Sequence, residues 1–305
     1  MTGLILHHHN PSPFAEKIRK IFGVKNLPWK SCQVSMVMPR PDMIALTGGY
    51  RKIPVLQIGA DIYCDTFLIA QILDRLYPEP PLFASGLLSN MAMQSWSDFM
   101  FRPGACLSLY ENAENLPQEV SDDRADYFTF MEFENFEKDA PHFRSQFRAK
   151  AGQLEAQLAD GRDYLLGKAP EWADLNAYAN IYMAHGNIPS AERMFEPYEK
   201  MHQWYERMSA IGVGDRSEIS TQDALAIARD TEPKLDKLAI DRDDECGLTA
   251  GDKVAVAPDD YGIVPVAGEL RHISDRQISI IRDDPQAGKV GVHFPREGFR
   301  IERVS

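Results

Sequence analysis

The sequence has little cysteine and no long apolar run. Its four cysteines are scattered over 305 residues without a CxxC pair, so they suggest neither a disulfide framework nor a dithiol redox centre nor a zinc knuckle. No stretch approaches the roughly 18 consecutive apolar residues of a membrane-spanning helix. The N-terminus lacks the layout of a signal peptide, because the apolar run Leu4–Leu6 is too short and leads into histidines. We therefore expect a cytoplasmic protein without a membrane partner.

Positive charge is also scarce. The chain carries 33 Lys and Arg against 45 Asp and Glu, a formal net charge of −12, which argues against a nucleic-acid partner. The first 84 residues depart from this balance, with nine basic against six acidic side chains. A modestly basic segment in an acidic chain suits a small anionic ligand.

The first 80 residues alternate strand and helix signals in the order βαβαββα. Strands are expected at Leu4–Leu6, Trp29–Val37, Val55–Ile58 and Asp61–Cys64, and helices at Ser12–Gly23, Pro41–Thr47 and Asp65–Leu76. Ser12 is a good N-cap, and Pro13 suits the first helical position. Four charged residues of the first helix are expected to face water: Glu16, Lys17, Arg19 and Lys20.

The remaining chain divides into two segments with different residue patterns. Residues 88–235 show helical patterns and no convincing strand, which predicts an all-helical bundle. Residues 246–305 are rich in Val and Ile, in short segments separated by Pro, Gly and Asp. Six strands are expected there: Lys253–Ala257, Gly262–Val266, Glu269–Ser274, Gln277–Arg282, Lys289–Phe294 and Phe299–Val304. They predict a small all-β barrel, SH3-like in strand number and spacing, so the fold class is α+β with several domains.

Four short motifs follow one another along residues 3–215. They are Ser12-Pro13-Phe14-Ala15-Glu16-Lys17-Ile18-Arg19, Lys52-Ile53-Pro54-Val55-Leu56, Asp65-Thr66, and Tyr164-Leu165-Leu166-Gly167 followed by Ala173-Asp174. In order and spacing they resemble the glutathione transferase family, in particular bacterial members whose first helix opens with Ser/Cys-Pro-Phe. The resemblance implies a thioredoxin-like glutathione-binding domain at 1–80 and an all-helical transferase domain at 88–235. The β-domain at 246–305 lies outside the common family architecture.

The resemblance also implies where glutathione would bind. The Ile53-Pro54 bond would be cis, and Ile53 would pair with the backbone of the cysteinyl unit. Asp65-Thr66 would hold the γ-glutamyl group, because the free N–H groups of a helix N-terminus favour a carboxylate. Lys52, or alternatively Arg51, would reach the glycyl carboxylate. No metal is expected in this site.

Catalysis in the family requires the thiol of glutathione to ionise, which a hydroxyl group and a helix N-terminus both favour. Ser12 is the predicted catalytic residue, and Asn10 and His9 are alternative donors. Since Ser12 replaces the cysteine of some relatives, conjugation, isomerisation or plain binding is favoured over thiol–disulfide reduction. The implied partners are glutathione as co-substrate, a small hydrophobic electrophile and a second copy of the chain in a homodimer. The implied role is detoxification.

Other features leave alternatives open. In the triplet His7-His8-His9, the first and third residues share one face of a strand, but without a nearby carboxylate or cysteine they make a weak metal site. Glu171 stands where the family has Ser or Thr as a helix cap, and Asp174 is expected to bond back to the helix start. The competing hypothesis is a non-catalytic glutathione-binding or regulatory protein that recognises a partner through its C-terminal β-domain.

Overall fold

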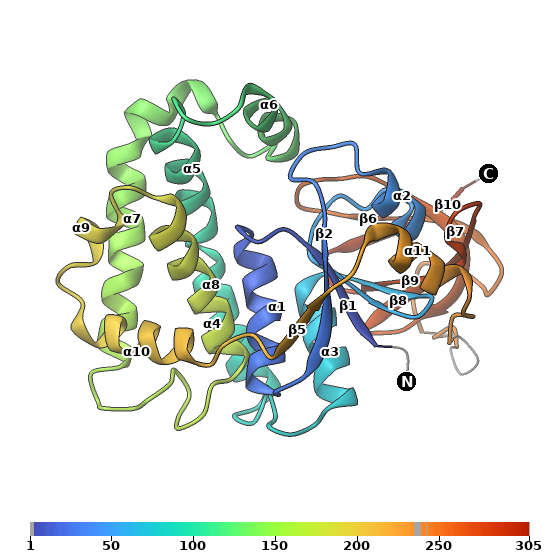
Figure 1. The fold of residues 1–305 in the computed structure, drawn as a ribbon, viewed down its shortest axis with the longest axis horizontal. Coiled ribbons are helices and arrows are strands. Elements are labelled where there is room, and N and C mark those ends of the chain that lie inside the picture. The colour runs from blue at the N-terminus through green and yellow to red at the C-terminus, as the bar shows by residue number, and fades with distance from the viewer. Residues whose placement is uncertain (1–2, 235–238, 242, 305) are drawn as a thin grey trace.

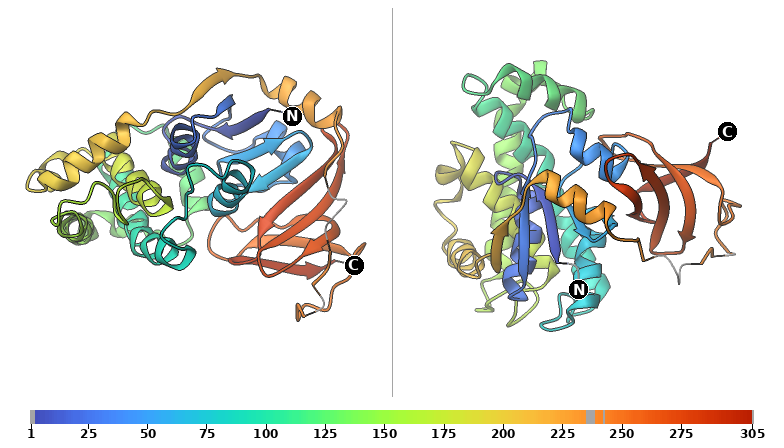
Figure 2. Two further views of the ribbon diagram at one scale, coloured as in Figure 1. Left: turned by 90° about the horizontal axis from the view of Figure 1, so that it is seen from below. Right: turned by 45° about the vertical axis from the view of Figure 1, so that its right-hand side comes forward.

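The computed structural model describes residues 3–234, 239–241 and 243–304. Residues 1, 235 and 305, which bound the domains expected from the sequence, lie outside this part of the chain. One half of the molecule is built of helices and the other half of strands covered by a few helices (Figure 1). The views in Figure 2 show the C-terminal strands beside the first sheet, on the side away from the helical half.

The order βαβαββα is confirmed in the first part of the chain. Its elements are β1 (Leu4–His8), α1 (Pro13–Val24), β2 (Pro28–Gln33), α2 (Pro41–Thr47), β3 (Val55–Ile58), β4 (Asp61–Cys64) and α3 (Thr66–Leu76). Ser12 caps α1 as expected, since its Oγ accepts a hydrogen bond from Ala15 N at 3.2 Å. Gly48 closes α2 with a left-handed φ of 78°. The second strand ends at Gln33, four residues earlier than predicted.

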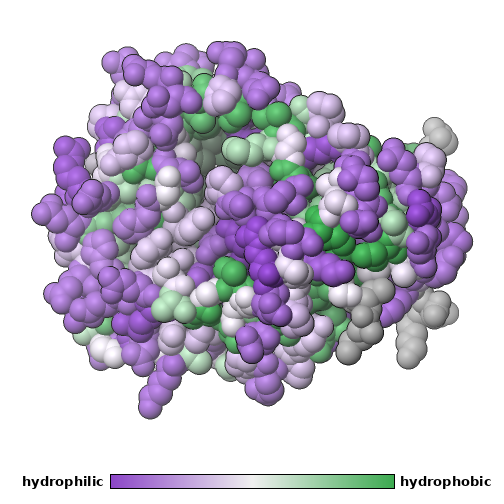
Figure 3. All heavy atoms as spheres, in the orientation of Figure 1, coloured by the Kyte–Doolittle hydropathy of each residue, from purple (hydrophilic) through white to green (hydrophobic). Residues whose placement is uncertain are grey.

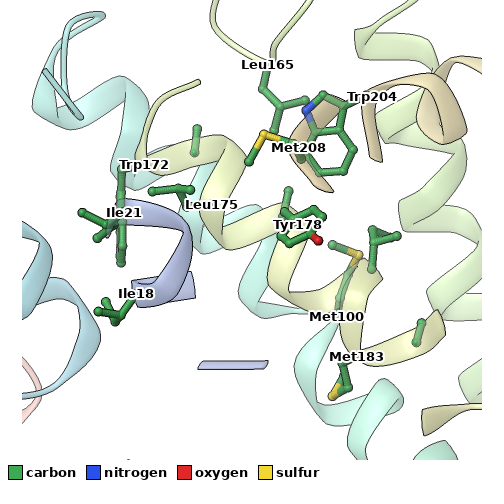
Figure 4. Packing of buried hydrophobic residues seen from close by; sticks show 14 of the residues in the cluster. Ile18, Ile21, Met100, Leu165, Trp172, Leu175, Tyr178, Met183, Trp204 and Met208 are labelled. Carbon is green, nitrogen blue, oxygen red and sulfur yellow. The ribbon is translucent and has the colours of Figure 1, made fainter. Parts of the chain in front are cut away.

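The helical half packs around α8. Its elements are α4 (Leu87–Asp98), α5 (Phe101–Glu111), α6 (Gln118–Tyr127), the 3₁₀ turn η1 (Phe133–Asn135), α7 (Phe136–Gln157), α8 (Trp172–Asn187), α9 (Ala191–Phe195) and α10 (Glu199–Ala210). Figure 4 shows Trp172 and Tyr178 of α8 in one buried cluster with Trp204 of α10 and Ile18 of α1. A single apolar core therefore joins the two halves. Within the described residues, no helix is both long and apolar enough to cross a bilayer.

The charged side chains of α1 do not face water, so that prediction is wrong. Glu16, Lys17, Arg19 and Lys20 are each between 3% and 6% exposed. The reason is tertiary, because α1 packs against α3 of its own domain and also against α8. Arg19 pairs with Glu16 at 2.7 Å, and Lys20 Nζ donates to Ser209 O at 2.9 Å, which gives three of these four buried charges a polar partner.

The C-terminal strands extend the first sheet. They are β6 (Lys253–Pro258), β7 (Val266–Ile273), β8 (Gln277–Asp284), β9 (Gly288–Pro295) and β10 (Phe299–Arg303). Strand β9 pairs in parallel with β4, so ten strands form one sheet in the order β10-β6-β7-β8-β9-β4-β3-β1-β2-β5. The expected strand at Gly262–Val266 is wrong except for its last residue. Residues 259–265 form a loop instead, in which Gly262 has a φ of 62°.

A strand also forms where only helices were expected. β5 (Asp215–Glu218) pairs in parallel with β2 at the edge of the sheet, and α11 (Thr221–Arg229) packs on α2 and β9. The sequence Asp-Arg-Ser-Glu of β5 has no apolar alternation, because an edge strand with exposed side chains needs none. Residues 215–229 thus belong to the sheet half of the molecule, although helical patterns had placed them with the bundle.

Candidate functional site

A cavity of about 340 Å³ lies where the sheet half meets α4; we call it the strand-end cavity. All five residues predicted to hold glutathione line it: Lys52, Ile53, Pro54, Asp65 and Thr66. The wall is completed by residues that the sequence analysis did not assign: Phe14, Lys17, Tyr50, Gln94, Asp98, Phe101, Tyr127, Asp260 and Tyr261. The fold therefore gathers the predicted binding residues at one place.

The start of α3 forms one end of this cavity. Asp65 is the N-cap, and its Oδ1 accepts a hydrogen bond from Phe67 N at 2.8 Å. Its φ of 75° is unusual for a residue other than glycine, and Asp tolerates it better than most. Thr66 is the first helical residue. The first backbone N–H groups of a helix have no partner inside the helix, and together with the helix dipole they favour an anionic group.

The bond between Ile53 and Pro54 is cis, as expected. Ile53 lies just before β3 and is half-buried. It lines the strand-end cavity and also a second cavity described below. The backbone of Ile53 is therefore placed between the two cavities.

The two basic residues before Ile53 point in different directions. Lys52 Nζ forms an ion pair with Asp260 Oδ1 at 2.5 Å and lies 4.2 Å from the ring centroid of Tyr261. Arg51 turns toward α6, where it pairs with Asp123 at 2.9 Å and with Asp126. Of the two alternatives left open by the sequence, the structure puts Lys52 in the strand-end cavity and commits Arg51 to α6.

Tyr261 brings the C-terminal region into the cavity. It lies on the loop 259–265 between β6 and β7, and its ring stacks on Phe101 with centroids 6.0 Å apart. The ring also meets Tyr127 edge-on at 5.2 Å. Burial raises the pKa of Tyr261 well above its ordinary value, so the hydroxyl stays protonated at neutral pH. Sequence reasoning missed Asp260 and Tyr261, because they stand about 200 residues from the motifs and the loop was taken for a strand.

Lys17 is a second charged residue that the sequence analysis did not place here. It is 4% exposed, and its Nζ lies 5.2 Å from the ring centroids of both Phe14 and Trp172. Burial lowers the pKa of Lys17, while Asp98 and Asp65 act in the opposite direction. The only sequence signal was its place in the first-helix motif.

A second cavity, of about 350 Å³, lies between the N-terminal segment and helices α5, α6 and α8; we call it the interdomain cavity. In Figure 3, hydrophobic side chains line a hollow below α6 in the upper part of the molecule. Four residues line both cavities: Phe14, Ile53, Phe101 and Tyr127. The two cavities are therefore neighbours across a thin, mostly aromatic wall.

Ser12 and His9 line the interdomain cavity, whereas Asn10 does not. Ser12 is 6% exposed, and its Oγ accepts the N-cap hydrogen bond of α1. His9 is half-buried, and burial together with Arg40 lowers its pKa to about 3. Asn10 is exposed; its Oδ1 accepts from Gln33 and Arg216 at 3.3 Å each. The structure thus brings two of the three candidate thiol contacts to the cavity and turns the third toward the sheet edge.

The histidine triplet has other partners. His7 Nε2 lies 2.7 Å from Gln57 Oε1, and His8 Nε2 lies 3.0 Å from Ser31 Oγ. In the described ranges, no three His, Cys, Asp or Glu side chains stand together in a way that could hold a metal ion.

The chain is similar to glutathione transferases. Residues 6–81 match the model of the glutathione S-transferase N-terminal domain, and residues 119–207 match that of the C-terminal domain. The crystal structure of a GST-like protein from Pseudomonas syringae matches over 100% of both chains, with 35% identity and a TM-score of 0.77. Because that match spans the whole chain, it includes the C-terminal strands.

Two other relatives match in part. Glutathione S-transferase U4 of Arabidopsis thaliana is 23% identical over 131 residues, a match that covers 42% of this chain and 58% of that relative's length. A glutathione transferase family member from Pseudomonas fluorescens, crystallised with two glutathione bound, has 14% identity and a TM-score of 0.51 over 68% of this chain and 89% of its own. This last likeness concerns the fold.

Proposed function

Because this chain belongs to the glutathione S-transferase family, we propose that it is a glutathione transferase. It binds glutathione in the strand-end cavity and joins the sulfur to a small electrophile held in the interdomain cavity. The observation that carries this proposal is the meeting of all five predicted binding residues in one cavity that shares a wall with the cavity of Ser12.

The strand-end cavity offers a complementary group to each part of glutathione. The γ-glutamyl carboxylate binds at the start of α3, where Thr66 and free N–H groups attract an anion, and Asp65 attracts the amine. The backbone of Ile53 pairs with the cysteinyl unit, which leaves the thiol at the boundary between the cavities. Lys52 binds the glycyl carboxylate in exchange for its present partner Asp260.

Ser12 lowers the pKa of the thiol by donating a hydrogen bond to the thiolate. Its oxygen already accepts from Ala15 N, and within the described residues its own hydroxyl hydrogen has no acceptor. The hydroxyl can therefore donate to sulfur, next to the positive end of the α1 dipole. The thiol proton leaves to solvent, the sulfur lone pair forms a bond to the electrophilic carbon, and the leaving group departs with its bonding electrons.

The first experiment measures thermal stabilisation by millimolar glutathione. The wild-type chain should be stabilised, and Lys52→Ala and Thr66→Ala should each reduce the stabilisation, because each removes a partner of a carboxylate. Absence of any stabilisation of the wild-type protein would contradict the proposed binding site.

The second experiment concerns Ser12. A hydrogen bond to a charged group is worth about 1.5–3 kcal/mol, so Ser12→Ala should lower turnover roughly 10- to 100-fold and weaken the ultraviolet absorbance of the bound thiolate. Ser220→Ala is the matched control, because Ser220 also caps a helix by accepting from Asp223 N at 3.0 Å but lines neither cavity. Unchanged turnover in Ser12→Ala would remove Ser12 from the mechanism.

A non-catalytic, regulatory protein is the second candidate. The observation in its favour is that Asp260 holds Lys52 and that Tyr261 stands in the strand-end cavity. Such a protein would bind glutathione without forming a thiolate, and the C-terminal strands would recognise its partner. Binding without turnover on any tested electrophile would favour it. The homodimer and the role in detoxification rest on the family resemblance and, like the cytoplasmic location, stay predictions.

A further inference from the structure

The interdomain cavity is rich in arginine. Three arginines line it, Arg40, Arg51 and Arg124, while Asp123 is the one carboxylate among the described residues of its wall. Asp123 is shared, since it pairs with Arg51 at 2.9 Å and with Arg124 at 2.6 Å, and Asp126 outside the wall also pairs with Arg51, which leaves an excess of one positive charge. This excess of positive charge on the wall favours an anionic ligand over a neutral apolar one.

Arg40 is the cation without a carboxylate. Its side chain donates to the backbone oxygens of Arg51 and Met36, each at 2.9 Å. Its Nε has no partner, and in the described part of the chain the residue forms no ion pair, although it is only 7% exposed. A guanidinium does not deprotonate in proteins, and a buried charge without a counter-ion is costly. Because Asp123 is already paired with Arg51 and Arg124, an anionic ligand in the cavity would supply Arg40 with a counter-ion of its own.

His9 adds a second unpartnered polar atom. Its Nδ1 is buried without a hydrogen bond among the described residues, and Arg40 and Arg124 are close enough to disfavour its protonation. The imidazole is therefore neutral, and with the proton on Nδ1 it donates a hydrogen bond. Arg40 and His9 thus each carry a buried polar atom without a hydrogen bond among the described residues, and both residues line the interdomain cavity.

The rest of the wall is mixed. Its apolar side chains include Phe14, Ile53, Phe101, Leu109, Val120 and Phe128, and its polar ones include Ser12, Ser108, Asn112, Asn115 and Asn187. A ligand that satisfies both parts of the wall combines an apolar, preferably aromatic, body with one anionic group. A second glutathione also carries carboxylates, but it has little apolar surface to offer this wall.

We propose that the electrophile of this protein is an aromatic molecule bearing a carboxylate, which binds Arg40 as its counter-ion with Arg124 and His9 beside it. That the ligand is an electrophile rests on the proposed function, whereas the anion site itself does not depend on catalysis. The reaction is the one already described, and the carboxylate takes no part in the bonds that form and break.

The direct test is a binding titration with two probes that differ in one group, 3,5-dinitrobenzoate and 1,3-dinitrobenzene, without glutathione. The wild-type protein should bind the benzoate roughly 10- to 100-fold more tightly, as expected for one hydrogen-bonded charge pair. Arg40→Met should reduce the ratio of the two affinities to about 3 or less, and Arg40→Lys should restore part of it. Arg75→Met, an exposed arginine of α3 that lines neither cavity, should leave the ratio unchanged.

The ratio of affinities is compared within each variant, so partial misfolding, which weakens both probes, does not imitate the effect. If Arg40→Met does not fold, Arg124→Met replaces it, because its side chain is 15% exposed and its loss leaves the hydrogen bonds of Arg40 in place. Equal affinity of the wild-type protein for both probes would overturn the proposal. Binding of two glutathione molecules per chain, reduced to one by Arg40→Met, would also overturn the proposal. The interdomain cavity would then hold a second glutathione.

The matched electrophiles 4-chloro-3,5-dinitrobenzoate and 2-chloro-1,3-dinitrobenzene separate this inference from the proposed function. In both, the sulfur bonds to the carbon that carries chlorine, chloride leaves with the bonding pair, and the thiol proton goes to solvent. A lower KM for the benzoate, lost in Arg40→Met, is expected. Selective benzoate binding without turnover would support the anion site and contradict the proposed transferase activity. Turnover with equal KM values would support the transferase activity and overturn the anion site.

Discussion

Two histidines of β1 are buried and uncharged. His7 binds Gln57, and His8 binds Ser31. Burial lowers the pKa of His7 to about 4 and that of His8 to about 3. The unfolded chain, whose histidines titrate near pH 6.5, therefore binds protons between pH 6.5 and 4 that the folded chain does not. The free energy of unfolding must fall as the pH drops through this window.

His7→Gln should reduce this loss of unfolding free energy at low pH. The glutamine can keep a side-chain hydrogen bond to Gln57 but cannot take up a proton in the unfolded state. We expect the loss of stability between pH 8 and pH 4.5 to shrink by about 2 kcal/mol, measured by urea unfolding at both values. The exposed His142→Gln on α7 is the control, and an equal effect of both variants would contradict the prediction.

Asp174 is a buried carboxylate with three N–H partners. It accepts from Glu171 N at 3.1 Å, which confirms the expected bond back to the helix start, and from Leu165 N and Trp204 Nε1 at 2.9 Å each. The Tyr-Leu-x-Gly and Ala-Asp parts of the fourth motif thus meet through this carboxylate. Glu171 is held by Ser85 and Asn90 instead of a simple cap bond.

Asp174→Asn should lower the free energy of unfolding by at least about 2 kcal/mol. An amide keeps the shape but turns an N–H₂ group toward donors, which leaves at least one buried group unsatisfied. Urea unfolding at pH 7 measures the change. Asp163→Asn, at an exposed position of the preceding loop, should change stability by less than about 0.5 kcal/mol.

At the scale of elements, the loop 259–265 gives the strand-end cavity part of its wall. Gly262 sits against the ring of Tyr127, where a Cβ would come within 2.5 Å of Tyr127 Cε2. Its positive φ and this close approach allow the loop to lay Tyr261 over Phe101 and Asp260 beside Lys52. A segment outside the two matched family domains thus forms part of the wall of the strand-end cavity.

Asp260→Asn should tighten glutathione binding if Lys52 receives the glycyl carboxylate. Asp260 is half exposed, and exposed ion pairs are worth about 0.2–1 kcal/mol, so the dissociation constant should fall roughly 1.5- to 5-fold. Calorimetric titration with glutathione measures it. Asp259→Asn, the adjacent exposed carboxylate, should have no such effect, and weaker binding by Asp260→Asn would show that Asp260 itself helps to hold the ligand.

At the scale of the whole molecule, a buried polar contact joins the C-terminal strands to the first domain. His293 of β9 lies 3.1 Å from Asp61 of β4, with both side chains 3% exposed, and its ring stacks on Tyr63. The amide of Gln277 donates to His293 Nδ1, so Nε2 carries the hydrogen that Asp61 accepts. One apolar cluster also includes residues of α2, β3 and the C-terminal strands. We expect these parts to unfold together.

His293→Ala tests this cooperativity. All four tryptophans precede residue 246, so their fluorescence reports on the parts of the chain that do not contain the change. The variant leaves the buried Asp61 carboxylate with the backbone N–H of Lys234 but without the imidazole, so the tryptophan-detected free energy of unfolding should fall by about 3 kcal/mol in one transition. An unchanged tryptophan transition would mean that β6–β10 unfold independently. Arg300→Ala, exposed on β10, is the control.

Local signals in the sequence were enough for the order of elements in the first domain. The caps at Ser12 and Asp65 and the turn at Gly48 involve neighbours within a few residues, and the structure forms them. Signals that depend on distant neighbours failed. Lys17 and Arg19 looked like solvent-facing residues of an amphipathic helix until α8 covered them, and the polar strand β5 exists only because β2 offers it an edge.

The sequence by itself therefore determined the βαβαββα order, because caps and turns act over a few neighbouring residues. Its short motifs pointed to the family, and the resemblance implied the five residues that gather in the strand-end cavity. Only the tertiary structure decided that β9 joins β4, that Asp260 and Tyr261 enter the site and that Arg40 Nε is buried without a partner among the described residues. These facts depend on contacts between distant segments, such as Asp61 and Gly291, which lie 230 residues apart. No local pattern encodes such contacts, since they arise from the burial of one surface against another.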